Sequence, residues 1–180
     1  MSEADTGVLN ATFCATLVDE WVRSGLTDAV VCPGSRSTPM AVALASEDRV
    51  RVHVHHDERS GAFMALGLAR VSGRAAVVLS TSGTAAVEFH PAVVEADLDR
   101  VPLLVLTADR PPRLRGVGAP QTIDQVDLYG SAVRSSTDAP LPTWENSGGW
   151  RALARQTWWA TNGSDPGPVH SWRARSEPVS

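Results

Sequence analysis

Four short strand-like segments, separated by stretches with helical periodicity, constrain the fold of this 180-residue chain more than any other feature. Their residues are apolar or alternate between apolar and polar, which is typical of strands, and the segments are too short for helices. Strands that alternate with helices favour a parallel sheet with both faces covered. The sequence therefore predicts an α/β fold, a doubly wound and mostly parallel sheet with helices on both faces, from strands at 28–32, 51–56, 75–79 and 103–106.

The stretches between these strands have the apolar spacing of amphipathic helices. Asn10 suits the N-cap of the first helix, and Thr38-Pro39 begins the second with a proline in its first turn. Pro91 is expected to bend a later helix, because proline removes a backbone donor. Beyond about residue 135 the pattern weakens to one helix and one short strand. The predicted helices are 10–23, 38–45, 62–71, 84–98 and 150–159, and the last strand is 168–170.

Charge and composition exclude several classes of function. The chain has 16 basic residues, all arginine, against 20 acidic ones, and this balance argues against a nucleic-acid binder. No apolar run reaches the roughly 18 residues of a membrane span, and the first ten residues lack the regions of a signal peptide. Cys14 and Cys32 are too few for a disulfide framework. We expect one cytoplasmic domain over residues 1–170 and a divergent tail over 171–180.

Polar residues follow each predicted strand, at the sheet edge where parallel sheets bind ligands. After the first strand, residues 33–36 (PGSR) offer backbone N–H groups and a guanidinium to an anion. After the second, Glu58 lies where the strand gives way to a helix, which suits a carboxylate that exchanges a proton with a ligand nitrogen. Each segment alone is also compatible with an ordinary turn or a solvated loop. The polar segments after the third and fourth strands are the hydroxyl-rich turn 80–84 and a loop with Asp109, Arg110, Arg113, Arg115 and Gln121.

Two other kinds of site remain open at this stage. His53, His55 and Asp57 fall on one face of a strand by their period-two spacing, which is compatible with a metal site. Cys32 ends a strand and is compatible with a nucleophile, although no spacing ties it to a histidine or an aspartate. A buried strand cysteine is the simpler interpretation of Cys32.

Six motifs occur in an order that is typical of a known family. They resemble the N-terminal, pyrimidine-binding domain of thiamine-diphosphate enzymes over residues 10–143, and weakly over 164–170. Within that superfamily they resemble the family of 2-succinyl-5-enolpyruvyl-6-hydroxy-3-cyclohexene-1-carboxylate (SEPHCHC) synthases of menaquinone biosynthesis. The motifs are PGSRSTP (33–39), HDERSGAFMALGLA (56–69), STSGTA (80–85), HPAVVEAD (90–97), LTADRPP (106–112) and QTIDQ (121–125).

The resemblance implies a transferase that uses thiamine diphosphate and Mg²⁺. It would decarboxylate 2-oxoglutarate and add the resulting succinic-semialdehyde carbanion to isochorismate. Glu58 matches the glutamate that binds N1′ of the cofactor's aminopyrimidine, a bond that prepares the cofactor for deprotonation. Thr81, Ser82 and Gly83 match positions near the pyrimidine ring. The residues that match the substrate side of the family's pocket are Ser35, Arg36, Arg110 and Gln121.

The sequence departs from the family at two positions. Glu88 and Pro120 stand where asparagine is usual. The first would alter the charge of the pocket, and the second would move Gln121.

The length also departs from the family pattern. The middle domain and the diphosphate-binding domain, whose Gly-Asp-Gly…Asn motif holds Mg²⁺, have no counterpart here, so a truncated or split chain with no metal ligands is expected. Because the family's sites form between subunits, the resemblance implies a homo-oligomer or a partner that carries the diphosphate-binding domain. Two alternatives stay open, namely a non-catalytic pyrimidine-domain subunit that needs a partner, and another thiamine-diphosphate enzyme such as an acetolactate-type synthase.

Overall fold

Six strands form a single sheet in the computed structural model, which describes the backbone of residues 3–174 and the side chains of residues 4–171. The strands are β1 (Asp28–Val31), β2 (Arg51–Val54), β3 (Ala76–Ser80), β4 (Leu103–Asp109), β5 (Ser135–Ala139) and β6 (Pro168–Ala174). Their order in the sheet is β2-β1-β3-β4-β6-β5, and every neighbouring pair is parallel. The predicted parallel sheet is confirmed.

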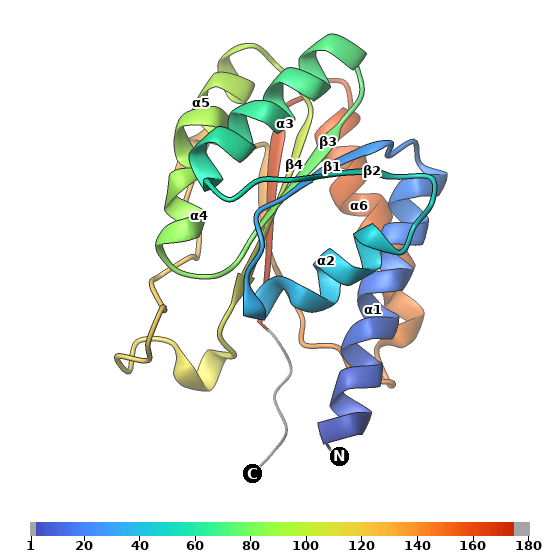
Figure 1. Cartoon of the computed structure of the whole chain (residues 1–180), viewed down its shortest axis with the longest axis vertical. Helices are drawn as coiled ribbons and strands as arrows, with labels where there is room; N and C mark the ends of the chain where they lie inside the picture. The colour runs from blue at the N-terminus through green and yellow to red at the C-terminus, as the bar shows by residue number, and fades with distance from the viewer. Residues whose placement is uncertain (1–2, 175–180) are drawn as a thin grey trace.

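Helices cover both faces of this sheet, so that the domain has three layers (Figure 1). One core cluster joins α1, α2 and α6 to alternate strand residues such as Val31 and Leu79, and the other joins α3 and α5 to Val30 and Val78. The period of two along each strand thus divides the buried side chains between two cores. The helices are α1 (Glu3–Arg23), α2 (Thr38–Ala45), α3 (Glu58–Ser72), α4 (Thr84–Glu88), α5 (His90–Leu98) and α6 (Trp150–Asn162).

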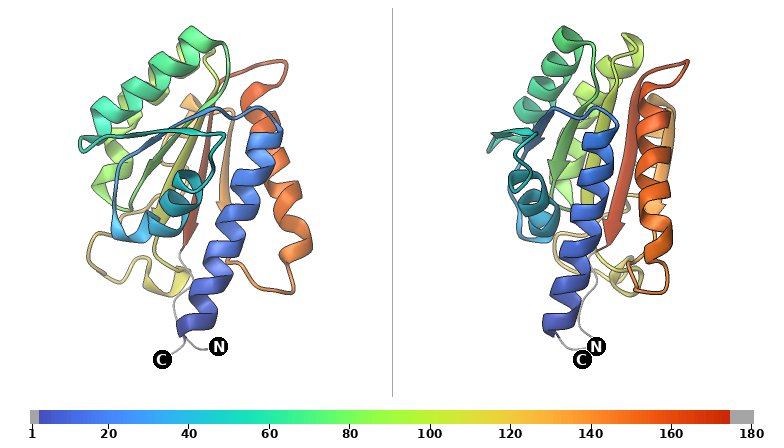
Figure 2. Two further views of the ribbon diagram at one scale, coloured as in Figure 1. Left: turned by 45° about the vertical axis from the view of Figure 1, so that its right-hand side comes forward. Right: turned by 90° about the vertical axis from the view of Figure 1, so that its right-hand side faces the viewer.

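The tryptophan-rich segment near the end of the chain forms α6, which lies beside α1 (Figure 2). The Trp21 indole N–H lies 3.1 Å from the carbonyl oxygen of Ala154 and 3.2 Å from the hydroxyl of Thr157. Phe13 meets Trp150 edge to face, with ring centroids 5.1 Å apart. The predicted helix at 150–159 is therefore confirmed, and Trp150 and Trp158 belong to the core cluster that includes the first helix.

Several predicted boundaries were wrong. Asn10 is buried inside α1, which begins at Glu3, so it does not cap the helix. The helix predicted over 84–98 is two helices that break at Phe89, and Pro91 occupies the first turn of α5, where its missing N–H costs nothing. Strand β5 was not predicted at all. The last strand runs on to Ala174 instead of ending at residue 170, and residues 175–180 of the expected tail lie outside the described part of the chain.

Candidate functional site

The connections after β1 and β3 meet at the carboxyl edge of the sheet, where the strand order reverses direction. A crevice at such a switch point is the usual ligand site of a doubly wound sheet. The two connections approach so closely that a Cβ atom on Gly34 would lie 2.4 Å from the Cβ of Thr81. Gly34 is extended, with φ −165°, so its requirement for glycine is steric rather than conformational.

Arg36 joins three segments at this crevice. It lies in the short 3-10 helix Ser35–Ser37, and its Nη1 donates to the Ser82 hydroxyl at 2.7 Å. Its Nη2 donates to the carbonyl of Pro120 at 3.2 Å. The Ser82 hydroxyl in turn donates to the carbonyl of Gln121 at 2.9 Å. Three of the residues expected at the site therefore belong to one hydrogen-bonded set.

Gln121 folds back over the turn after β3. Its side-chain amide donates to the carbonyl of Ser82 at 3.1 Å and lies 3.5 Å from the hydroxyl of Thr81. Gln121 has φ +56°, a conformation that residues other than glycine seldom adopt, and it directly follows Pro120. Gly83 has φ +85°, and a Cβ there would lie 3.1 Å from the Gln121 side chain. Thr81, Ser82 and Gly83 thus form one buried wall of the crevice, with Gln121 across it.

Two arginines of the arginine-rich loop, Arg110 and Arg115, have different partners. Arg110 donates to the carbonyl of Pro120 at 3.3 Å, so it converges with Arg36 on one oxygen atom. Arg115 instead pairs with Asp109 at 2.8 Å and with Asp138 at 2.8 Å, which ties the loop to β4 and β5. Burial raises the pKa of Asp109, and the neighbouring backbone N–H and the charge of Arg115 oppose that shift. Arg115 therefore holds the loop in place through two carboxylates.

Glu58 occupies a different part of the same edge. It is the first residue of α3, and Asp57 caps that helix by accepting a hydrogen bond from the Ser60 N–H at 2.7 Å. The Glu58 side chain is half-buried, and within the described residues it shares no hydrogen bond with the Arg36 set. Ser35 is exposed in the turn after β1. The structure thus brings Arg36, Arg110, Ser82 and Gln121 together and leaves Glu58 apart from them.

The other two kinds of site find little support. His53 lies 3.1 Å from Asp28, and Asp57 is the helix cap, so both side chains have structural partners. No three histidine, cysteine or acidic side chains in the described part of the chain are arranged to hold a metal ion. Burial, with the charges of Glu58 and Asp57 beside it, raises the pKa of the Cys32 thiol to about 12. A thiol in that state is a poor nucleophile at neutral pH.

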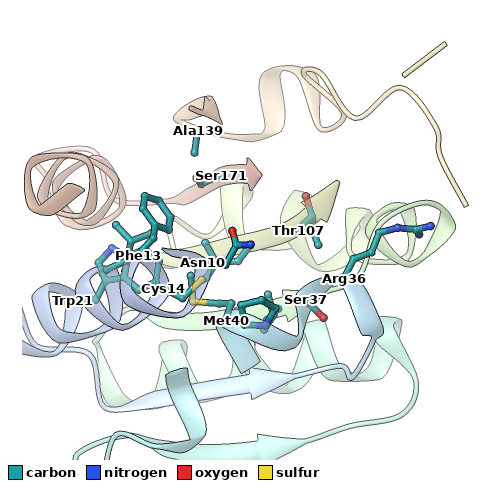
Figure 3. A pocket seen from close by; sticks show the side chains of 15 residues that line it. Asn10, Phe13, Cys14, Trp21, Arg36, Ser37, Met40, Thr107, Ala139 and Ser171 are labelled. Atoms are coloured by element: carbon teal, nitrogen blue, oxygen red, sulfur yellow. The ribbon is translucent and has the colours of Figure 1, made fainter. Parts of the chain in front are cut away.

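An apolar cavity of about 60 Å³ lies beside the crevice, on the α1 side of the sheet (Figure 3). Phe13, Cys14 and Trp21 line its inner end, and the Arg36 side chain points away from them. A cavity that holds a benzene-sized molecule measures about 150 Å³. The cavity beside the crevice is smaller than that.

Gln125 is a buried residue of the site that the sequence analysis did not single out. Its Oε1 accepts the Gly83 N–H at 3.0 Å, and its Nε2 donates to the Thr107 hydroxyl and the Ala108 carbonyl, each at 3.1 Å. The QTIDQ motif could have indicated Gln125, because Gln125 is the second glutamine of the motif and follows Gln121 by four residues.

The two positions that depart from the family lie in different surroundings. Glu88 is exposed at the end of α4, and the carbonyl of Pro120 accepts hydrogen bonds from two arginines.

No described helix is long and apolar enough to cross a membrane.

Comparison with known proteins places these observations in a family. Residues 11–128 match the model of the thiamine pyrophosphate enzyme, N-terminal TPP binding domain. Curated proteins named 2-succinyl-5-enolpyruvyl-6-hydroxy-3-cyclohexene-1-carboxylate synthase are similar to this chain. The protein from Thermobifida fusca is 54% identical over 91% of the chain, and the protein from Halobacterium salinarum is 48% identical over 95% of it. The protein from Bacillus velezensis is 55% identical over 72% of the chain.

The match covers only part of each relative. The chain spans 30% of the length of the T. fusca and H. salinarum proteins and 22% of the B. velezensis protein. The matched residues 11–128 include every candidate site residue described above, together with the first four strands of the chain. The chain therefore belongs to the thiamine pyrophosphate enzyme family, and residues 11–128 are its N-terminal TPP-binding domain.

Proposed function

We propose that this chain is the pyrimidine-binding part of a SEPHCHC synthase, which decarboxylates 2-oxoglutarate and adds the remaining four-carbon unit to isochorismate in menaquinone biosynthesis. The observation that carries the proposal is the hydrogen-bonded set of Arg36, Ser82 and Gln121 at the switch point of the sheet. Both substrates are carboxylates, and Arg36 and Arg110 converge on the Pro120 carbonyl. Two guanidinium groups held so near each other suit the recognition of a carboxylate.

The residues present fit the pyrimidine end of thiamine diphosphate. Glu58 offers a half-buried carboxylate at the start of α3, and the turn Thr81–Gly83 presents only small side chains to the crevice. When bound, thiamine diphosphate supplies the electron sink for the loss of CO₂ from a 2-oxo acid. In this proposal Glu58 holds a proton at ring nitrogen N1′, and Arg36, Arg110, Gln121 and Ser35 bind and orient the acids.

The proposal assigns the diphosphate and Mg²⁺ to residues beyond this chain, on the same polypeptide or on a partner. Exposed apolar side chains on β2, α3 and α4 favour such an arrangement: Val54 is 60% exposed, Phe63 39%, Met64 36% and Val87 40%. Exposed large apolar side chains are often covered by a partner in an assembly. We propose that a second copy or a diphosphate-binding half covers these side chains, in the cytoplasm, where the free thiols of Cys14 and Cys32 stay reduced.

A chimera tests this function directly. The chain replaces the homologous N-terminal segment of the T. fusca relative, and the purified chimera is assayed with 2-oxoglutarate and isochorismate in the presence of thiamine diphosphate and Mg²⁺. We expect release of CO₂ and formation of the joined product. Glu58→Gln keeps the shape of the side chain but removes the carboxylate, so that variant should fold and lose the activity.

Two results would contradict the proposal. One is a Glu58→Gln chimera with near-normal turnover, which would remove Glu58 from the chemistry. The other is a chimera that prefers pyruvate to 2-oxoglutarate, which would favour the acetolactate-type alternative. Cofactor binding without turnover would favour a non-catalytic subunit.

A further inference from the structure

The side-chain amide of Gln125 has only one possible orientation. The Gly83 N–H can only donate a hydrogen bond and the Ala108 carbonyl can only accept one, and both lie within 3.1 Å of this amide. Its oxygen must therefore face Gly83, and its nitrogen must face Ala108 and the hydroxyl of Thr107. Gln125 is 1% exposed, so water does not compete for these bonds.

A chain of buried polar groups continues from Gln125 into the sheet. The Thr107 hydroxyl accepts from Gln125, which leaves its own proton for His170 Nε2 at 2.9 Å. Burial lowers the pKa of His170 to about 3, so the ring is neutral at pH 7 and keeps an unprotonated nitrogen for this bond. His170 also packs edge to face with Tyr129, at 4.6 Å between ring centroids. The Gln125 amide is thus supported by residues of β4 and β6.

The two glutamines of the QTIDQ motif hold the same turn from two sides. Gln121 donates to the carbonyl of Ser82 at 3.1 Å, and Gln125 accepts the next backbone N–H, that of Gly83, at 3.0 Å. Gly83 has φ +85° and lies against Gln121, so a shift of its peptide would move the wall of the crevice and Gln121 together. Hydrogen bonds of this kind fix a backbone conformation that glycine alone would leave mobile.

We propose that Gln125 is a positioning residue of this site, which fixes the Gly83 peptide and thereby the turn Thr81–Gly83 and the place of Gln121. Of the groups assigned to the cofactor or the acids, Gln125 is bonded only to the Gly83 peptide, so it acts through the turn. The identity of the ligand rests on the proposed function, whereas the role of Gln125 in holding the turn does not.

Amide hydrogen exchange in the 180-residue chain, followed by NMR, tests this inference. Gln125→Met keeps the length of the side chain and removes the acceptor of the Gly83 N–H. We expect the Gly83 amide to exchange faster by roughly tenfold or more, the equivalent of one lost hydrogen bond. The Val78 amide, inside β3, should keep its rate. Gln156→Met is the matched control, because Gln156 is exposed on α6 and far along the chain from the crevice.

Thr107→Val is the second variant, and it decides the question if Gln125→Met does not fold. It preserves side-chain shape and removes one of the two acceptors that hold the Gln125 amide, so Gly83 exchange should rise several-fold. Unchanged Gly83 exchange in the variants that fold would overturn the inference. Equal acceleration at Gly83 and Val78 would also overturn it, since that result indicates general destabilisation.

Titration with thiamine diphosphate, read from the same amide signals, separates this inference from the proposed function. We expect Gln125→Met to bind about tenfold more weakly than Gln156→Met, because its turn is no longer fixed. If the unsubstituted chain shows no response to thiamine diphosphate, the proposed cofactor site fails while the exchange data still decide the role of Gln125. Equal affinity in the two variants would limit Gln125 to a structural contact and overturn its positioning role.

Discussion

The guanidinium of Arg36 lies 2.7 Å from the hydroxyl oxygen of Ser82, which joins the connection after β1 to the connection after β3. Because the same hydroxyl donates to the carbonyl of Gln121, the loop after β4 is held by the same pair. The crevice is therefore formed before any ligand arrives, by hydrogen bonds between three connections that are distant in sequence.

Replacing Arg36 tests how much this set contributes to stability. Arg36→Ala removes the bonds to Ser82 and Pro120, and we expect the free energy of unfolding to fall by about 1 kcal/mol, since the guanidinium is half-exposed. Arg36→Lys should recover little, because an ammonium cannot span both partners. Urea denaturation of the chain measures both values. Equal stability of the lysine variant and the unsubstituted chain would show that charge alone suffices.

Gly34→Ala should be strongly destabilising. Its methyl group would lie 2.4 Å from the Cβ of Thr81, and overpacking of this kind costs about 1–3 kcal/mol. Gly67→Ala is the control, since Gly67 lies in α3 with no atom within 4 Å of the added methyl. That change should stabilise the chain by up to about 1 kcal/mol. Effects of the same sign in the two variants, measured by thermal unfolding, would contradict the steric argument.

Arg115→Ala should destabilise the chain by about 3 kcal/mol, because it leaves the buried Asp109 without its cation. Adding Asp109→Asn should restore much of that loss, since the double variant no longer buries an unpaired charge. Arg74→Ala, at an exposed position, serves as the control. Chemical denaturation of the unsubstituted chain, the two single variants and the double variant measures the coupling between Arg115 and Asp109. Strict additivity of the two single substitutions would mean that the pair is not coupled.

Stability should fall as the pH drops below about 6.5 because of His170. Burial lowers the pKa of its ring to about 3, so between those pH values the unfolded chain binds a proton that the folded chain does not. The contribution of His170 to the free energy of unfolding is then fully present above pH 6.5. Below that pH the free energy of unfolding decreases by at most about 1.4 kcal/mol per pH unit. Denaturation at pH 7 and pH 5 should show a smaller decrease in His170→Gln. His56→Gln, at an exposed position, should keep the full decrease, and identical slopes in all three proteins would exclude His170 as the cause.

Cys32 should resist alkylation in the folded chain. Its thiol is 1% exposed and burial raises its pKa to about 12, so almost no thiolate is present at pH 8. Mass spectrometry after treatment with iodoacetamide should find Cys32 unmodified in the native chain and modified in urea. Rapid native labelling would revive the nucleophile interpretation.

The parallel sheet could be predicted because its central strands are buried on both faces and therefore consist of short apolar runs. Strand β5 (SSTDA) was missed because it is a half-buried edge strand, and its place depends on β6 and on the Arg115–Asp138 pair rather than on its own residues. The start of α1 was predicted too late in the chain, because Asn10 has the residue type of an N-cap but lies inside a longer helix.

The site was predictable where a motif carried it. Arg36, Ser82 and Gln121 were expected from the family resemblance, and the structure joins them. The role of Arg115 could not be predicted, because its partners Asp109 and Asp138 come from separate segments. Gln125 was hidden for the same reason, since its partners Gly83, Thr107 and Ala108 lie in other parts of the chain.

The strand order has a consequence for the emergence of this chain from the ribosome. Strand β5 has only one neighbour among the described strands, and that neighbour, β6, is made later. The four strands β2, β1, β3 and β4 can pair as soon as residue 109 is clear, but β5 must wait as an unpaired segment until residues 168–174 have followed it. During that interval the edge of β4 is open to other chains. Co-translational aggregation of this domain should therefore begin at the open edge of β4.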